Sequence, residues 1–369
     1  MSATTSVPLL DDVDALHAGD PHAMLRNVAS AGEQVREALA TCDAAGLSDV
    51  AAAGRPRAVV VAGMGGSGIA GHVLQAAAGT DCPIPVERVR GWGLPAWVGP
   101  DDLVVAVSSS GRTAETASCT AEALRRGARL VVVAADGSPL VRTAQEHGVP
   151  WVAVPDGRPP RANLWALSVP LLVAGDALGI VHAPSDQLAA VAELLDGIAE
   201  RCAPEVPSAA NPAKQLAAEL AGTFPMLWGS TDLGGIAAYR MLCQLAENAK
   251  TPSVNGVLPE ALHNQVVVLD GPTAQPAAAQ PLRLVLLRDS VESVQQARGA
   301  DAAAKLVQER GVAVSTITAE GTHPLQRMAS LVAVGDFASV YLGLLLGVDP
   351  TSIAPIDELK AAIAAAAAD

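Results

Sequence analysis

The sequence predicts an α/β protein made of two similar domains, each with a flavodoxin-like parallel sheet flanked by helices. Short apolar runs rich in Val, Leu and Ala are each followed by a Gly or Ser loop and then by residues at helical spacing. This order recurs in both halves of the chain, and strands that alternate with helices favour parallel sheets. Half of the residues are hydrophobic but only 2% are aromatic, which suits close packing of helices on such sheets.

The first half of the chain predicts a helical segment followed by one sheet. Residues 8–52 carry apolar side chains at helical spacing, and we expect residues 1–52 to form an N-terminal helical segment. Buried strands are predicted after this segment, bounded by clusters of glycine or serine residues. These strands are predicted at 57–62, 103–108, 129–134 and 151–154.

The second half repeats this pattern after a pair of helices expected at 164–178 and 185–198. We expect a first domain over residues 53–180 and a second over 181–369, the latter including a C-terminal helix. The second domain is predicted to contain strands at 224–229, 282–287 and 312–316, and helices at 234–250, 324–346 and 356–368.

The charge balance argues against two classes of partner. A formal net charge of −14 disfavours binding to nucleic acids and to anionic membranes, which require a basic face. The longest apolar stretch, 167–178, contains Pro170, Gly175 and Asp176, so no membrane span is expected there.

Cysteine and histidine spacing gives no sign of a bound metal. The five cysteines are widely spaced and form no C-x-x-C pair, which is typical of reduced thiols in a cytoplasmic protein. The N-terminus lacks the basic region of a signal peptide. The seven histidines are scattered without H-x-x-x-H spacing, and we expect neither a metal nor another cofactor.

The loop at 63–68, G-M-G-G-S-G, follows a predicted strand and precedes a helix. It matches the dinucleotide fingerprint G-x-G-x-x-G, and Glu87 lies near the position of the acid that would bind the ribose. Two other interpretations stay open, a phosphate cradle and a turn that only packs a helix on a strand. Thermal shift with NAD and NADP would test the dehydrogenase alternative.

A second loop, Ser108-Ser-Ser-Gly-Arg-Thr113, supplies four hydroxyl groups at the next junction of strand and helix. Hydroxyls and free N–H groups at a helix start form an anion site, and we expect Ser110 or Thr113 to cap that helix. Solvated serines on a capped helix are the structural alternative. Because a dinucleotide fold has no need of this hydroxyl cluster, the two loops together favour a phosphosugar.

Glu247 and His263 lie sixteen positions apart, in E-N-A-K and P-E-A-L-H-N. A carboxylate and an imidazole at one substrate suit proton transfer at carbon and at a sugar ring oxygen. Taken alone, Glu247 is equally an exposed residue or an ion-pair partner of Lys250, and His263 an ordinary surface or core histidine.

These motifs, with Pro159-Pro-Arg161 and with Lys360 near the C-terminus, occur in one order and resemble the SIS (sugar isomerase) family, within it the bifunctional phosphoglucose/phosphomannose isomerases. The resemblance implies two SIS domains and a homodimer in which His263 enters the partner's site. It implies that Glu247 shuttles a proton between C1 and C2, that Arg161 stabilises the enediolate, and that His263 and Lys360 assist ring opening. The implied substrate-binding residues are Gly66, Ser67, Ser108, Ser110 and Thr113.

The expected function is therefore an aldose–ketose isomerase that interconverts fructose 6-phosphate with glucose 6-phosphate, mannose 6-phosphate or both. The alternative is a catalytically silent SIS protein that senses a phosphosugar. Arg112, Ser109 and Gln265 stand where the family pattern has Asn, Tyr and Glu, and these departures leave the preferred hexose phosphate open.

Overall fold

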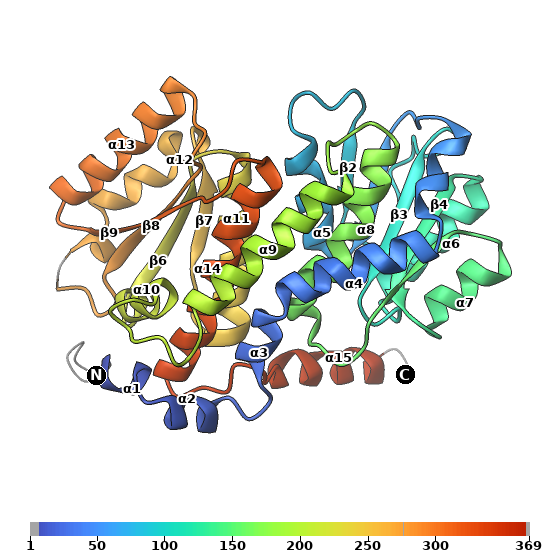
Figure 1. The fold of residues 1–369 in the computed structure, drawn as a ribbon. Helices are drawn as coiled ribbons and strands as arrows, with labels where there is room; N and C mark the ends of the chain where they lie inside the picture. The colour runs from blue at the N-terminus through green and yellow to red at the C-terminus, as the bar shows by residue number, and fades with distance from the viewer. Residues whose placement is uncertain (1–6, 276, 367–369) are drawn as a thin grey trace.

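The computed structural model describes residues 7–275 and 277–366 and contains two α/β units that lie side by side (Figure 1). The sheet of the first unit has the strand order β2-β1-β3-β4-β5, with every pair parallel. This is the flavodoxin-like order. Its strands are β1 (Val59–Gly63), β2 (Val86–Val89), β3 (Leu103–Ser108), β4 (Arg129–Ala135) and β5 (Trp151–Val154).

The second unit has the parallel order β7-β6-β8-β9, which repeats the first four positions of the other sheet. The predicted α/β class with two parallel sheets is thus confirmed. The edge strand β7 was missing from the prediction, because V-N-G-V has neither an apolar run nor regular alternation. The strands are β6 (Phe224–Gly229), β7 (Val254–Val257), β8 (Leu282–Arg288) and β9 (Ala313–Thr318).

Helices cover both faces of each sheet, and those predicted at 164–178 and 185–198 are present. The α-helices up to the domain junction are α1 (Val7–Leu10), α2 (Val13–Gly19), α3 (Met24–Ala29), α4 (Ala31–Ala44), α5 (Gly65–Ala78), α6 (Ala114–Arg126), α7 (Pro139–Glu146), α8 (Leu164–Ala177) and α9 (Ser185–Arg201). Those that follow are α10 (Pro212–Leu220), α11 (Asp232–Ala249), α12 (Glu260–His263), α13 (Val294–Glu309), α14 (Pro324–Leu345) and α15 (Ala354–Ala366). The 3-10 turns are η2 (Leu47–Ala53), η3 (Pro160–Ala162), η4 (Gln265–Asp270) and η5 (Pro272–Ala274).

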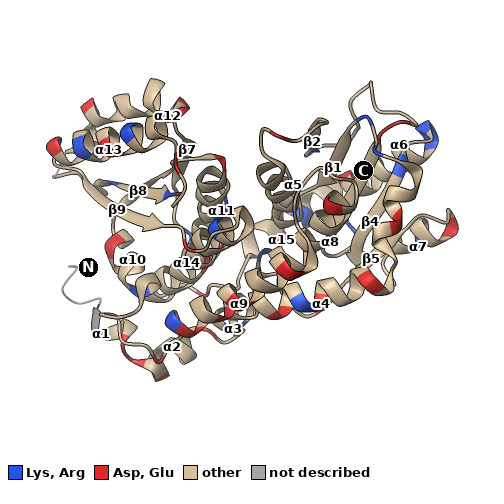
Figure 2. Cartoon of the chain, turned by 45° about the horizontal axis from the view of Figure 1, so that its top comes forward, with Lys and Arg blue, Asp and Glu red and all other residues tan. Residues whose placement is uncertain are grey.

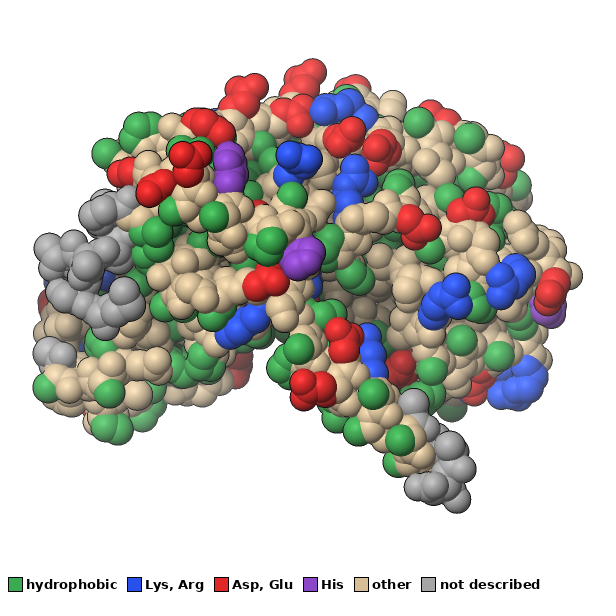
Figure 3. Space-filling view, turned by 90° about the horizontal axis from the view of Figure 1, so that it is seen from below, with side chains coloured by type: hydrophobic (Ala, Val, Ile, Leu, Met, Phe, Trp, Pro, Cys, Tyr) green, Lys and Arg blue, Asp and Glu red, His purple; other side chains and the backbone are tan. Residues whose placement is uncertain are grey.

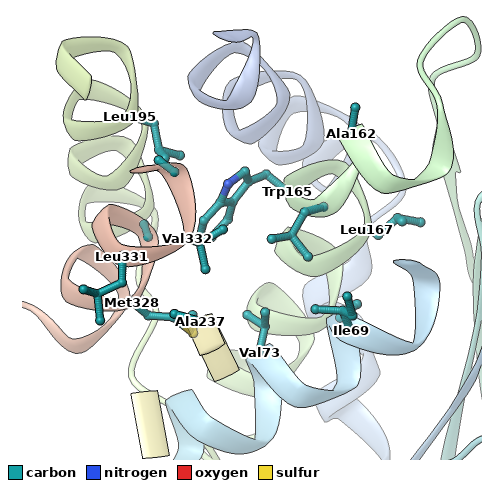
Figure 4. Close-up of a cluster of buried hydrophobic side chains, with 14 of the residues drawn as sticks. Ile69, Val73, Ala162, Trp165, Leu167, Leu195, Ala237, Met328, Leu331 and Val332 are labelled. Carbon is teal, nitrogen blue, oxygen red and sulfur yellow. The ribbon is translucent and has the colours of Figure 1, made fainter. Parts of the chain in front are cut away.

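A shared hydrophobic core joins the two units (Figure 4). Trp165 of α8 reaches toward Leu195 of α9 and Val332 of α14, while Val73 of α5 and Ala237 of α11 close the cluster below it. Every one of these side chains is buried. Since apolar burial contributes about 25 cal/mol per Å², this cluster fixes the two sheets relative to each other.

Helix α14 is the central element of the second unit. It has 22 residues, and an 18-residue window with a mean hydropathy of 1.7 gives it the length and composition of a membrane span, but that window is 100% buried inside the protein. A Cβ on Gly343 would approach the Asn248 carbonyl oxygen to 2.4 Å, so glycine there permits close contact of α14 with α11. We assign α14 to the core.

A buried ion pair crosses this core between α11 and α14. Arg240 Nε and Nη2 lie 3.0 and 2.9 Å from the two carboxylate oxygens of Asp336. Burial raises the pKa of Asp336, and the Arg240 guanidinium opposes that shift. Arg240 Nη2 also donates to the carbonyl oxygen of Arg161, so the pair holds a segment of the first unit as well.

We expect Asp336→Ala to lower the free energy of unfolding by about 3–5 kcal/mol, because it leaves the buried Arg240 charge without a partner. Chemical denaturation of the purified variant measures this loss. The double variant Arg240→Met/Asp336→Leu is the control and should regain most of the stability, since it removes both charges. A loss below about 1 kcal/mol for Asp336→Ala would contradict this account of the pair.

Candidate active site

The two hydroxyl-bearing loops meet at the carboxyl edge of the first sheet. Strands β1 and β3 pair directly, with Gly63 opposite Val107, and the strand order reverses between them, where open α/β sheets bind ligands. Ser67 Oγ accepts a 3.0 Å hydrogen bond from the Ser109 N–H, and Ser108 Oγ lies 3.0 Å from Thr113 Oγ1. The predicted cradle residues are therefore brought together.

The expected capping of α6 by Ser110 or Thr113 is wrong. Thr113 occupies the N-cap position, but its hydroxyl bonds Ser108 instead of a helix N–H. Ser110 Oγ accepts from the Arg112 N–H at 3.3 Å. The first intrahelical bond runs from Ala117 N to the Thr113 carbonyl, so the preceding N–H groups at the helix start are available to an anion.

The glycine loop at 63–68 packs closely against the P-P-R segment, in addition to its possible role in binding an anion. A Cβ on Gly66 would lie 3.0 Å from the Pro160 carbonyl oxygen and 3.5 Å from Arg161 Cα. Glycine at this position therefore lets the P-P-R segment approach the first turn of α5. The close approach brings Arg161 to the cradle without a side chain between them.

The dinucleotide alternative depended on Glu87, and the structure places that residue away from the loop. Glu87 lies partway along the edge strand β2 and pairs with Val60. Val60 is three positions before Gly63, so Glu87 lies about 10 Å below the carboxyl edge. A ribose on the glycine loop would need the acid at that edge. The geometry therefore disfavours dinucleotide binding.

Arg161 of η3, in the first unit, lies beside Glu247 of α11, in the second unit. The region where these elements of the two units meet is called the domain seam. Arg161 Nη1 lies 3.6 Å from Glu247 Oε2, with 3% and 30% of their side chains exposed. Arg161 Nε donates to Asn248 Oδ1 at 2.7 Å, and Nη2 donates to the carbonyls of Pro350 and Thr351 at 2.6 and 2.9 Å. Burial lowers the pKa of Arg161, but a guanidinium stays protonated. Its Nη1 group faces the Glu247 carboxylate.

Lys250 does not neutralise Glu247 in the way that the ion-pair alternative requires. Its φ of +53° ends α11 in the left-handed region. The ammonium donates to the backbone carbonyls of Glu247, Asp349 and Ser352 at 2.7, 2.9 and 2.8 Å. Lys250 therefore fixes the segment that leads into α15, and the Glu247 carboxylate remains opposite Arg161.

His263 lies far from Glu247 within one chain. It ends α12, is exposed, and follows β7. A Cβ on Gly235, in the first turn of α11, would contact Val257 of β7 at 3.2 Å, whereas Glu247 is in the last turn of that helix. The 12 positions from Gly235 to Glu247 correspond to about 18 Å of helix. His263 therefore follows a strand that packs at the other end of α11 from Glu247. Figure 1 shows α12 at the top of its unit and α15 at the bottom of the other.

The loop beside His263 is held by Gln265, one of the departures from the family pattern. Its Oε1 accepts from Trp228 Nε1 at 2.7 Å, and its Nε2 donates to the Asn255 carbonyl at 2.8 Å. A glutamate at this position would have no N–H group to donate to the Asn255 carbonyl. The amide therefore suits the structure of this loop in the present chain.

Lys360 lies on α15, which projects from the body of the protein (Figure 3). The side chain is exposed and makes no hydrogen bond or ion pair within residues 7–275 and 277–366. Ile356, Leu359 and Ile363 expose 40%, 61% and 60% of their surface on the same helix. Within the described residues of one chain, Lys360 therefore forms no ion pair with Glu247, whose cationic neighbour is Arg161. The predicted helix end at 367–368 lies outside the described residues.

At the carboxyl edge of the second sheet, a carboxylate takes the place that the hydroxyl-bearing loops have in the first unit. Asp289, after β8, accepts from Thr231 Oγ1 at 3.2 Å and from Arg327 Nε at 2.6 Å. Its N–H donates to Ser230 Oγ at 2.9 Å. Asp289 thus already takes the hydroxyl and guanidinium donors that an anion would need there, so the first unit carries the candidate phosphate site.

Acidic side chains are spread over the outer helices of both units (Figure 2). Across the described ranges, no group of three or more His, Cys, Asp or Glu side chains is placed to hold a metal ion.

Comparison with known proteins agrees with this geometry. Residues 209–363 match the model of the C-terminal SIS domain of bacterial phospho-glucose isomerase. In fold, the chain is similar to a hypothetical protein from Thermus thermophilus, with a TM-score of 0.76, 19% identity and coverage of 100% of this chain and 96% of that one. A glucose-6-phosphate isomerase like protein from the same organism gives a TM-score of 0.56 and 24% identity over 82% and 88% of the two chains.

Two curated relatives have the same name, bifunctional phosphoglucose/phosphomannose isomerase. The one from Caldicellulosiruptor bescii is 34% identical over 82% of this chain and 88% of its own length. The one from Aquifex aeolicus is 28% identical over 82% and 89%. A D-glucosamine-6-phosphate 4-epimerase from Sulfolobus acidocaldarius is 30% identical, but over only 55% of this chain and 61% of its own. By its tandem SIS-like units and its identity to these relatives, the chain belongs to the family of bifunctional phosphoglucose/phosphomannose isomerases.

Proposed function

We propose that this protein is an intramolecular oxidoreductase that interconverts fructose 6-phosphate with glucose 6-phosphate, mannose 6-phosphate or both, through a cis-enediol. The observation that carries the proposal is the buried Arg161 guanidinium opposite the Glu247 carboxylate, beside the two hydroxyl loops. This is the set of groups that isomerisation of an aldose phosphate requires.

In the proposed mechanism the substrate phosphate binds at the first unit's carboxyl edge. The ligands are the hydroxyl groups and N–H groups of Gly66, Ser67, Ser108, Ser110 and Thr113. The N–H groups at the start of α6 add a partial positive charge. An exposed Arg112 lies in the same loop and adds a full charge near the anion.

Glu247 is the proposed base. Its carboxylate removes the proton from C2 of the aldose and returns it to C1. O1 takes up a proton and O2 gives one up, so that C1 becomes CH2OH and C2 becomes the carbonyl. The enediolate that forms between these steps carries its charge on oxygen, where Arg161 Nη1 can donate to it. Because Nη2 and Nε are already engaged with backbone and Asn248, the guanidinium keeps its orientation during the reaction.

Ring opening is assigned to His263 and Lys360, and it requires a homodimer. The separation of α12 from the last turn of α11 supports donation of His263 from the partner subunit. The exposed apolar side chains of α15, which a second subunit would cover, support the same proposal. Each site would then combine Glu247 and Arg161 of one chain with His263 of the other.

A coupled assay tests the proposed function. Purified protein is given fructose 6-phosphate, and glucose 6-phosphate and mannose 6-phosphate are detected by separate coupling enzymes. We expect both products, because glucose and mannose phosphates differ only at C2, which is planar in the enediol. A galactosamine product from glucosamine 6-phosphate would instead indicate C4 epimerisation. No turnover, together with a raised Tm in the presence of fructose 6-phosphate, would favour a phosphosugar sensor.

A further inference from the structure

A cluster of cationic and aromatic side chains lies in the seam between the units, apart from the groups used above. Arg88 lies on β2 and Arg90 directly follows it. His72 belongs to α5, and Tyr239 to α11. The ring of Tyr239 stacks on that of His72 with centroids 4.8 Å apart and planes at 8°. The cluster thus joins one strand and one helix of the first unit to a helix of the second.

Two glycines of α5 make room for the arginine side chains. A Cβ on Gly68 would lie 3.5 Å from Arg90 Cδ, and a Cβ on Gly71 would lie 3.3 Å from Arg88 Cγ. Gly68 and Gly71 are one helical turn apart and present a smooth face toward β2. Both guanidinium groups are therefore carried across α5 toward α11 and the domain seam.

The partners of these arginines are neutral. Arg88 Nη1 lies 2.8 Å from His72 Nδ1, and burial together with the two guanidinium groups lowers the pKa of His72 to about 4. Arg90 Nη1 donates to Tyr239 Oη at 2.7 Å, and its guanidinium carbon lies 5.5 Å from the centroid of that ring. At neutral pH the cluster carries two positive charges on these four side chains.

No carboxylate within the described residues lies within 4.0 Å of either guanidinium, whereas Arg57, Arg126, Arg240, Arg288 and Arg327 all have one. Arg88 is half-buried and Arg90 exposed. Each guanidinium has a neutral hydrogen-bonding partner, His72 or Tyr239, and no anionic partner at ion-pair distance, although the chain has a net charge of −14 and partly buried charges are normally paired. An anion supplied from solution would complete this arrangement.

We propose that Arg88 and Arg90 form a second anion site, distinct from the hydroxyl loops, that binds a phosphoryl group in the domain seam. Guanidinium groups offer planar pairs of donors that match the oxygens of a tetrahedral oxyanion. Tyr239 is on the face of α11 that also carries Cys243 and Glu247, at intervals of four residues. A phosphoryl group bound here would therefore contact the helix of the proposed base without occupying the cradle.

The experiment measures phosphate binding and does not depend on isomerase activity. Inorganic phosphate is titrated into the full chain by calorimetry, and glycerol 3-phosphate is titrated separately to test whether an organic phosphate binds as free phosphate does. Thr113→Val removes a hydroxyl of the cradle, and Arg90→Gln removes an exposed charge of the second site. Arg310→Gln removes an exposed charge of the second unit, where Arg310 pairs with Asp270, and is the control for the change in net charge.

We expect wild type to bind phosphate at two sites. Arg90→Gln should weaken one of them about tenfold or more while the other persists, since each charge-assisted hydrogen bond lost has a cost of that order. Thr113→Val should show the reverse pattern, and Arg310→Gln should bind as wild type does. Unchanged phosphate binding in Arg90→Gln, or complete loss of it in Thr113→Val, would overturn the proposal.

Discussion

Glu247→Gln is expected to lower kcat for isomerisation by about a thousandfold while KM changes little, because general base catalysis contributes about 10²–10⁴ in rate. The amide keeps the size of the carboxylate but cannot take up a proton at neutral pH. The Glu247 side chain is 30% exposed and its carboxylate makes no hydrogen bond to the core within the described ranges, so the fold should be unaffected. The coupled assay gives both constants, and circular dichroism checks the fold.

The control for Glu247→Gln is Glu309→Gln. Glu309 pairs with Lys305 on the surface of α13, with 60% of its side chain exposed, so the variant changes the net charge equally without touching the seam. It should retain wild-type kcat. If Glu247→Gln keeps more than about a tenth of wild-type kcat, Glu247 is not the general base.

The sequence predicted those parts of the fold that depend on local patterns. Strands such as 103–108 and 151–154 were located by continuous apolar runs between turn residues, and the structure confirms them to the residue. Strand β7 was missed because Asn255 and Gly256 interrupt its pattern, and its pairing with β6 is what makes it a strand. A tertiary contact overrides weak local preference there.

The candidate site was predicted by motif and not by geometry. The sequence named Arg161 and Glu247 without showing that they meet, because 86 positions separate them, 161 to 247. The sequence marked Asn248 and Lys250 only as neighbours of Glu247. In the structure, Asn248 orients Arg161, and Lys250 holds the segment before α15. Such roles come from backbone carbonyls of distant segments, which carry no sequence signal.

The capping of α6 shows the opposite failure, in which a local rule gave the wrong partner. Ser and Thr at a helix start usually accept from an N–H of the first turn. In this chain Thr113 pairs with Ser108, since β3 brings that hydroxyl to the same edge. A cradle needs its N–H groups unoccupied, so the broken rule fits an anion site.

Mixing two inactive variants, Glu247→Gln and His263→Ala, is expected to restore about a quarter of wild-type activity. In a two-fold symmetric dimer whose sites take Glu247 from one chain and His263 from the other, a mixed dimer has one site with both defects and one with neither. Random exchange at equal amounts makes about half of all dimers mixed, which gives the quarter. The two chains are co-expressed with different tags, which report the mixed dimers, and the whole population is assayed for fructose 6-phosphate turnover.

Because His263 and Glu247 lie apart within one chain, the co-expression experiment is the most direct test of the proposed homodimer. A double variant, Glu247→Gln/His263→Ala, co-expressed with Glu247→Gln forms mixed dimers that contain no intact site, and it should remain inactive. If the first mixture also stays inactive although mixed dimers form, His263 does not act across the interface. Restored activity would instead show that one chain supplies the base and its partner the imidazole. Within a single chain, Glu247 is in the last turn of α11, whereas His263 ends α12, which follows the strand packed on the first turn of α11.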